Sequence, residues 1–152
     1  MKPLDHKQRN ALTILMADVD PDDRQLTKEA LREVCLKDHF AEVCDCEELL
    51  SYLRREGKYA ELAGQRLPRI ILLDLNMQKM GGLEVLNELK SDPDLRRIPI
   101  VVLTTSKAEE DIMRTYDLGA NSFITKPVTF DALIKVMKSL TQYWFEIVEL
   151  PE

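Results

Sequence analysis

The sequence predicts a single doubly wound α/β domain, in which a five-stranded parallel sheet is covered by five helices. Three observations lead to this expectation. Short apolar runs suited to strands alternate five times with segments of helical periodicity. The connections between them are short, which requires right-handed crossovers and therefore a mostly parallel sheet. The chain has 152 residues without repeats or low-complexity segments, which matches one domain of ordinary size.

The predicted strands are apolar runs that end at polar residues. The clearest is 70–73, four consecutive apolar residues between Pro68 and Asp74 that are typical of a strand buried on both faces. A carboxylate directly after such a strand lies where open α/β sheets carry their functional groups. The five expected strands are residues 12–17, 40–45, 70–73, 98–103 and 122–125.

The predicted helices follow from apolar residues at helical spacing. The first follows an acidic loop at 18–23, and the next two cover 47–56 and 82–90. The fourth begins at a capping box formed by Ser106 and Glu109 and ends at Gly119, and the last begins near Thr129. The residues expected to face the sheet are Leu26, Ala30, Leu31, Val34, Leu49, Leu50, Leu53, Leu83, Leu86, Leu89, Phe130, Leu133, Ile134, Met137, Leu140 and Trp144.

Charge and composition exclude several classes of function. A net charge of −6 and a pI near 5.1 argue against a nucleic-acid partner, which would require a basic patch. No apolar run approaches the roughly 20 residues that cross a bilayer, and the polar start lacks the apolar core of a signal peptide, so we expect a cytoplasmic protein. The three cysteines, Cys35, Cys44 and Cys46, are expected to be reduced, and their spacing does not suit zinc.

Polar residues follow four of the predicted strands. Asp18 and Asp20 follow the first strand, and Asp74, Thr104 and Lys126 follow the third, fourth and fifth. All of them lie at one edge of a parallel sheet. The carboxylates can hold Mg²⁺ through oxygen, the lysine and hydroxyl can bind phosphoryl oxygens, and an aspartate can act as nucleophile and form an acyl phosphate.

Each residue also has a purely structural interpretation. Asp18 and Asp20 could cap the first helix, as Asp22 and Asp23 are expected to do. Thr104 could be an ordinary strand-end hydroxyl, and 126–127 an ordinary turn. Four such coincidences at one sheet edge are much less probable than any single one, which favours the functional interpretation.

These residues resemble the receiver domain of two-component response regulators, which has the flavodoxin-like form of the doubly wound fold. The resemblance covers about 13–140. The matching motifs are the acidic loop at 18–20, the segments 73–77 and 80–83, and the strand ends at 103–106 and 123–127.

The resemblance implies that Asp74 accepts a phosphoryl group from a phosphohistidine of a sensor histidine kinase. It also implies that Mg²⁺ is bound by Asp18, Asp20, Asp74 and the backbone carbonyl of Asn76. The phosphoryl-binding and switch residues would be Thr104, Thr105, Lys126 and the aromatic Phe123, while Asn76 and Ser106 would tune dephosphorylation. The Lys126–Pro127 bond would be cis. By this likeness the chain is a signalling phosphoacceptor and not an enzyme.

Two features resemble the single-domain regulators of phytochrome kinases: the connection containing 59–63 and the apolar tail. We expect a polar arm at 1–11, a receiver domain at 12–142 and a tail at 143–152. No residues follow for a DNA-binding output domain, so the signal would leave by protein contact. The tail is expected to form a homodimer contact, although it could instead fold back on its own domain.

The chain departs from the family pattern at Val19, where receivers usually carry the acid that binds the metal directly. Either Asp18 or Asp20 could turn inward to replace the missing carboxylate, or the site could bind the metal weakly. We expect phosphorylation that is weakened but not abolished. The alternative is a pseudo-receiver, a protein-binding domain that no longer depends on phosphate. A phosphohydrolase is disfavoured, because Asn76 stands where its general acid would be needed and cannot donate a proton in that way.

Overall fold

The computed structural model describes residues 14–34, 40–65, 67–74, 82–104, 122–127 and 129–142. Within these ranges one sheet contains five strands in the order β2-β1-β3-β4-β5, and all neighbouring pairs are parallel. The prediction of a five-stranded parallel sheet is therefore confirmed. The strands are β1 (Ile14–Ala17), β2 (Phe40–Val43), β3 (Ile70–Leu73), β4 (Ile100–Thr104) and β5 (Ser122–Thr125).

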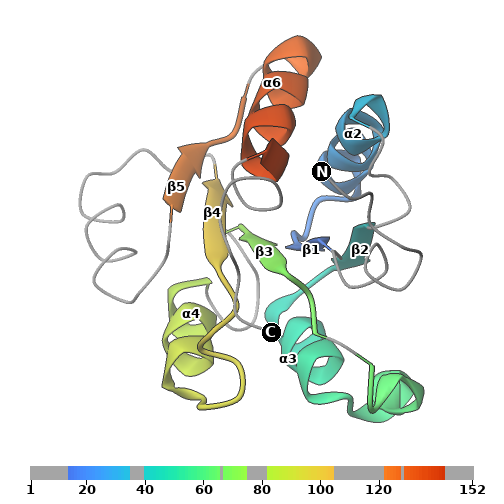
Figure 1. Ribbon diagram of the computed structural model, residues 1–152, viewed down its shortest axis with the longest axis vertical. Helices are drawn as coiled ribbons and strands as arrows, with labels where there is room; N and C mark the ends of the chain where they lie inside the picture. Colours follow the sequence, from blue (N-terminus) through green and yellow to red (C-terminus); the bar gives the residue numbers. More distant parts are fainter. Residues whose placement is uncertain are drawn as a thin grey trace, which may run out of the picture.

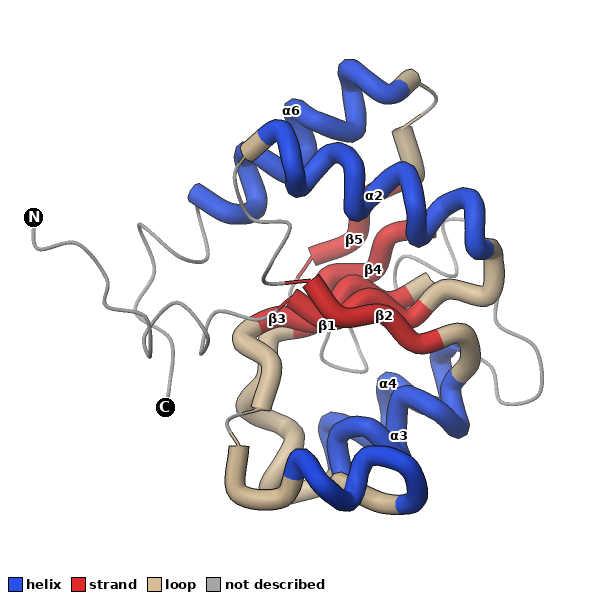
Figure 2. The backbone as a smooth tube through the Cα atoms, turned by 90° about the vertical axis from the view of Figure 1, so that its right-hand side faces the viewer, coloured by secondary structure: helices blue, strands red, loops and turns tan. Residues whose placement is uncertain are grey.

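Helices cover both faces of the sheet, as in a doubly wound fold. Helices α2 and α6 lie together over one face, and α3 and α4 lie over the other (Figures 1 and 2). The helix predicted at 106–119 lies outside the described residues. The described helices are α2 (Pro21–Glu33), α3 (Cys46–Arg54), α4 (Gly82–Ser91) and α6 (Phe130–Thr141), with a short 3₁₀ helix, η2 (Gly57–Leu62), after α3.

Alternation along the central strands builds two cores. Successive side chains of a strand point to opposite faces, so β1 and β3 supply apolar groups to both helical layers. Leu15 and Ile71 pack against α3 and α4, whereas Met16 and Leu72 pack against α2 and α6. All four of these side chains are at most 2% exposed. This two-sided burial is the reason why β3 reads as an uninterrupted apolar run.

The inner face of α2 differs from the prediction. Leu26, expected to face the sheet, is 46% exposed, whereas Thr27 is buried. The buried stripe runs through Thr27, Ala30 and Leu31, and Leu26 lies about 100° away from it around the helix. In α6, Phe130 is also exposed, because it is the first residue of the helix.

Most of the remaining residues that were predicted to face the sheet are buried or partly buried. Leu49, Leu50 and Leu53 of α3, Leu86 and Leu89 of α4, and Leu133 and Met137 of α6 are buried as predicted. Val34, Ile134 and Leu140 are partly buried and pack against the core beneath α2 and α6. The side chain of Leu83 and the whole of Trp144 lie outside the described part of the chain.

The prediction of a cis bond between Lys126 and Pro127 is wrong. The described residues contain no cis peptide bond, so this bond is trans. The trans isomer is the one that X–Pro bonds prefer, by about 0.5–1 kcal/mol.

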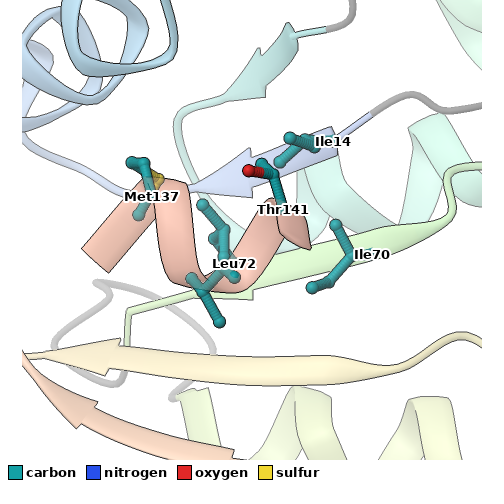
Figure 3. A pocket seen from close by; sticks show the side chains of 6 residues that line it. Ile14, Ile70, Leu72, Met137 and Thr141 are labelled. Atoms are coloured by element: carbon teal, nitrogen blue, oxygen red, sulfur yellow. The ribbon is translucent and has the colours of Figure 1, made fainter. Parts of the chain in front are cut away.

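A small apolar cavity lies between the sheet and the end of α6 (Figure 3). It has a volume of about 10 Å³ and is lined by Ile14, Ile70, Leu72, Met137, Leu140 and Thr141. The Thr141 hydroxyl donates to the Lys138 carbonyl, and the other five lining residues are apolar. The cavity is a packing gap at the opposite end of the strands from the predicted site. None of the helices in the described ranges is long and apolar enough to cross a membrane.

Candidate functional site

The register of the sheet brings the two central aspartates side by side. Ala17, the last residue of β1, pairs with Leu73, the last residue of β3. Asp18 and Asp74 follow them directly, and the Asp74 N–H donates to the Ala17 carbonyl at 3.0 Å. Both carboxylates are buried, with residue exposures of 0% and 4%. The sequence-based expectation that these two strand ends meet is confirmed.

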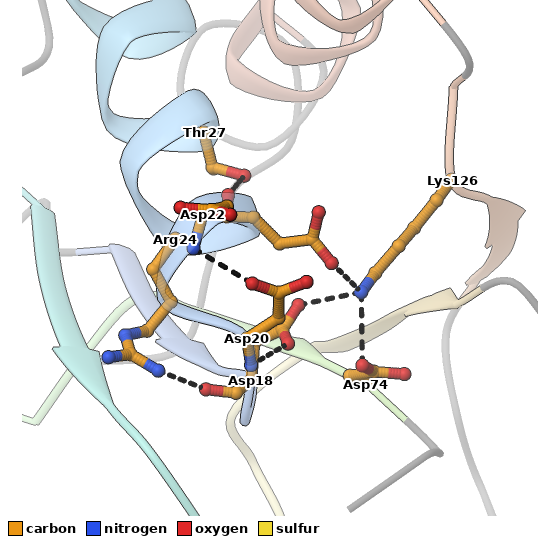
Figure 4. Close-up of polar contacts among 8 residues, drawn as sticks. Asp18, Asp20, Asp22, Arg24, Thr27, Asp74 and Lys126 are labelled. Atoms are coloured by element: carbon orange, nitrogen blue, oxygen red, sulfur yellow. Dashed lines mark hydrogen bonds and ion pairs between the residues drawn. The ribbon is translucent and has the colours of Figure 1, made fainter.

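Hydrogen bonds fix Asp18 on every side. Its N–H donates to the Val43 carbonyl, and its Oδ1 accepts the Asp20 N–H at 2.9 Å. A guanidinium nitrogen of Arg24 donates to the Asp18 carbonyl at 2.7 Å (Figure 4). The Nε of Arg24 donates to the Glu42 carboxylate at 3.3 Å. The Asp18 Oδ2 atom is thereby directed toward the centre of the site.

Lys126 joins three carboxylates at that centre. It follows β5, whose Thr125 pairs with Thr104 at the end of β4. Its Nζ lies 2.7 Å from Asp18 Oδ2, 2.7 Å from Asp23 Oδ2 and 3.0 Å from Asp74 Oδ2 (Figure 4). These are the short distances of charge-assisted hydrogen bonds.

Burial and hydrogen bonding shift the pKa values of Asp18 and Lys126. Burial raises the pKa of Asp18, and the hydrogen bonds from Lys126 and the Asp20 backbone offset that rise only in part. Burial lowers the pKa of Lys126, but its hydrogen bonds to the three carboxylates outweigh this effect and raise the pKa above its ordinary value. Lys126 therefore stays protonated at neutral pH and holds the carboxylates together.

Two aspartates at the start of α2 have different roles: Asp20 caps the helix and Asp23 contacts Lys126. The Asp20 carboxylate accepts the Asp22 N–H at 2.9 Å and caps α2. Asp22 is exposed. Asp23, which the sequence analysis treated as a helix-terminal acid, contacts Lys126 instead. The signal that could have found it is helical spacing, because Asp23 lies four residues before Thr27, on the stripe that faces the sheet.

The other predicted site residues lie partly or wholly outside the described part. The backbones of Thr104 and Phe123 lie in β4 and β5, near the same edge, but their side chains are not described. Asn76, Thr105 and Ser106 lie outside the described residues. Val19 follows Asp18 and is 37% exposed.

The donor set suits a hard divalent cation. Two buried carboxylates converge on a single cationic atom, and oxygen ligands of this kind are those that Mg²⁺ prefers. Among the described residues no group of three or more His, Cys, Asp or Glu is arranged to hold a metal ion by itself. Cys44 and Cys46 are free thiols. Asp18 and Asp74 would thus hold a divalent ion only together with water or further ligands.

Comparison with known proteins identifies this arrangement. The family model of the response regulator receiver domain matches residues 14–138. The chain belongs to the response regulator receiver family. A receiver domain is a signalling phosphoacceptor of two-component systems rather than an enzyme of the usual kind. The expected family and the expected class of protein are therefore confirmed.

Relatives of this receiver domain include a regulator that is named for a phytochrome. The response regulator Rcp1 of Synechocystis sp. is 36% identical over 138 residues, which cover 91% of this chain and 92% of that protein. The crystal structure of the phosphorylated cyanobacterial phytochrome response regulator RcpA is 41% identical with a TM-score of 0.84, and covers 92% of this chain and 98% of that one. The crystal structure of the Mn²⁺-bound form of Rcp1 has a TM-score of 0.81 at 36% identity, and the match covers 92% of this chain and 99% of that one.

Proposed function

We propose that this receiver domain is a phosphorylation-switched signalling module whose phosphoacceptor is Asp74. A carboxylate oxygen of Asp74 attacks the phosphorus of a phosphohistidine on a sensor histidine kinase. The P–N bond breaks, an acyl phosphate forms on Asp74, and the released imidazole takes up a proton. The observation that carries the proposal is the contact between Lys126 Nζ and the buried Asp74 Oδ2 at 3.0 Å, with Asp18 beside it.

The chain's own residues supply positioning and charge. Asp74 is held at the end of β3, and Lys126 offers an N–H donor to phosphoryl oxygens that develop next to Asp74. Thr104 and Phe123 would complete the phosphoryl-binding and switch residues, together with Thr105. Asn76 and Ser106 would tune dephosphorylation.

A divalent cation would be held by Asp18 and Asp74, with Asp20 and the Asn76 carbonyl as further candidate ligands. When bound, it would neutralise the negative charge of the incoming phosphoryl group. The Mn²⁺-bound form of Rcp1 supports the binding of a divalent cation by this receiver domain as well. Because Val19 supplies no carboxylate, we infer that Mg²⁺ is held more weakly here than in receivers with an acid at that position.

A pseudo-receiver is the second candidate, and Val19 is the observation that favours it. Incubation with acetyl phosphate and Mg²⁺, followed by intact-mass measurement, separates the two. A phosphoacceptor gains the mass of one phosphoryl group, and Asp74→Asn does not. Asp94→Asn is the matched control, since Asp94 is exposed before β4, at the opposite edge of the sheet. A wild type that gains no mass at saturating Mg²⁺ would overturn the proposal.

The proposed partners follow from the relatives and the tail. The similarity to RcpA, a cyanobacterial phytochrome response regulator, supports a phytochrome-type sensor histidine kinase as the phosphoryl donor in the cytoplasm. The proposed units are the arm 1–11, the receiver 12–142 and the tail 143–152, and the apolar tail would serve as a homodimer contact. Truncation after Tyr143 should lower the mass measured by light scattering from dimer to monomer. An unchanged mass would refute the tail-mediated dimer.

A further inference from the structure

Asp23 is a carboxylate of this site to which no role has been assigned. It is the third residue of α2, and its Oδ2 lies as close to Lys126 Nζ as the Oδ2 of Asp18 does, at 2.7 Å. Its side chain is 34% exposed, whereas the lysine side chain is 13% exposed. The ion pair therefore spans the rim of the site, between α2 and the start of the β5–α6 connection.

Helix α2 fixes Asp23 independently of the lysine. The buried Thr27 donates its hydroxyl hydrogen to the Asp23 carbonyl at 2.9 Å, and both residues lie on the stripe that faces the sheet. A carboxylate in the first turn is also favoured by the helix dipole. The Asp23 carboxylate is therefore carried on a short side chain from a backbone held in α2, whereas the Lys126 ammonium lies at the end of a flexible four-carbon stem and has to be placed.

The Lys126 ammonium has one N–H donor for each of the three carboxylates that it contacts. A lysine ammonium has three N–H donors and no acceptor, and the structure places three carboxylate oxygens within hydrogen-bonding distance. A phosphoryl group on Asp74 would replace one of the three acceptors. The contacts to Asp18 and Asp23 can persist and keep the ammonium in place.

We propose that Asp23 is a positioning residue for phosphoryl transfer. Together with Asp18 it holds the Lys126 ammonium so that the third N–H faces Asp74 before the phosphoryl group arrives. This role rests on the proposed function, because it concerns the same reaction. Without Asp23, Asp18 would be the one remaining carboxylate that holds the ammonium beside Asp74, and a smaller fraction of molecules would present a donor to the incoming phosphoryl group.

The test compares two neutralising substitutions in the first turn of α2. Asp23→Asn and Asp22→Asn remove the same charge, but Asp22 is exposed and has no side-chain contact with Lys126 among the described interactions. Both variants are phosphorylated with acetyl phosphate and Mg²⁺, and the rate constant is followed by intact mass. We expect Asp23→Asn to be slower by about tenfold, the change that corresponds to losing one charge-assisted hydrogen bond in the transition state, with Asp22→Asn near wild type.

Two further measurements separate positioning from other effects. Asp23→Glu should recover part of the rate, because a cavity of about 40 Å³ beside Asp23 and Lys126 has room for the extra methylene. The Mg²⁺ affinity, measured by calorimetry without acetyl phosphate, should be equal in Asp23→Asn and Asp22→Asn if Asp23 acts through the lysine. A lower affinity in Asp23→Asn alone would show that Asp23 acts on the cation and would overturn the positioning role.

The outcomes distinguish this inference from the proposed function. If the wild type is not phosphorylated, both the proposed function and the positioning role of Asp23 are overturned. A phosphorylated wild type with equal rates in Asp23→Asn and Asp22→Asn overturns the positioning role alone. A faster Asp23→Asn would show that Asp23 holds the lysine away from the reaction and would also overturn it.

Discussion

Val19→Asp should tighten the binding of Mg²⁺. The substitution places a carboxylate directly after Asp18, at the position where the resemblance to receiver domains led us to expect a metal-binding acid. The Asp18 backbone is fixed by Val43 and Arg24, so residue 19 begins from a defined point at the edge of the sheet. The new carboxylate therefore joins Asp18 and Asp74 without requiring the strand to move.

The expected size follows from the exposure of the position. Two unit charges 4 Å apart interact by about 1 kcal/mol in water and about 4 kcal/mol at the effective dielectric of a protein surface. The Val19 side chain is 37% exposed, so solvent screens a new charge there strongly and the lower part of that range applies. About 1.4 kcal/mol corresponds to a tenfold lower dissociation constant.

Calorimetric titration of Mg²⁺ at fixed ionic strength measures this change. Ala63→Asp is the matched control, because Ala63 is exposed in the turn after η2 and the substitution adds the same charge far from the site. The control should bind Mg²⁺ as the wild type does. A Val19→Asp dissociation constant equal to that of the wild type would refute the reasoning, since it would mean that the missing carboxylate is already compensated.

Three further predictions concern stability. Asp20→Ala should lose about 1 kcal/mol of unfolding free energy in urea, whereas Asp20→Asn should retain it because asparagine caps α2 equally well; equal losses would exclude capping. Leu86→Ala should lose about 2–5 kcal/mol of unfolding free energy in the same assay, since Leu86 is fully buried on the inner face of α4. A loss below about 1 kcal/mol would contradict this packing. Burial raises the pKa of Cys46 from 9.0 to about 12, so the unfolded chain ionises first. Stability contributed by the neutral thiol is then lost as the pH rises above 9. The unfolding free energy of the wild type should fall relative to that of Cys46→Ala by at most about 1.4 kcal/mol per pH unit. Parallel plots of unfolding free energy against pH for the two proteins would contradict the raised pKa.

The sheet and most of the site could be predicted because their signals are local. Each apolar run that ends at a polar residue marks a strand and its edge, and parallel pairing places Asp18, Asp74 and Lys126 together whatever the details of packing. Periodicity likewise predicted the inner leucines of α3. In both cases one short segment carries the whole signal.

The errors arose where the orientation of a helix depends on its neighbours. In α2 a leucine, Leu26, seemed a better inner residue than a threonine, but packing against the sheet and α6 selects the stripe of Thr27 and Ala30. The same rotation directs Asp23 to Lys126. Hydrophobicity alone could not predict this contact, because two members of the inner stripe, Asp23 and Thr27, are polar and both form hydrogen bonds.

The contacts of Lys126 also link the site to completion of the fold. They join residues separated by 108, 103 and 52 positions along the chain, to Asp18, Asp23 and Asp74 respectively. Contacts of such range require the intervening strands to be in place, and β5 leaves the ribosome after the other four described strands. A nascent chain that ends before Ser122 can form the aspartates' strands but has no ammonium to neutralise two adjacent buried carboxylates. The cluster of Lys126 and its three carboxylates is therefore completed only after β5 and the residue that follows it have been synthesised.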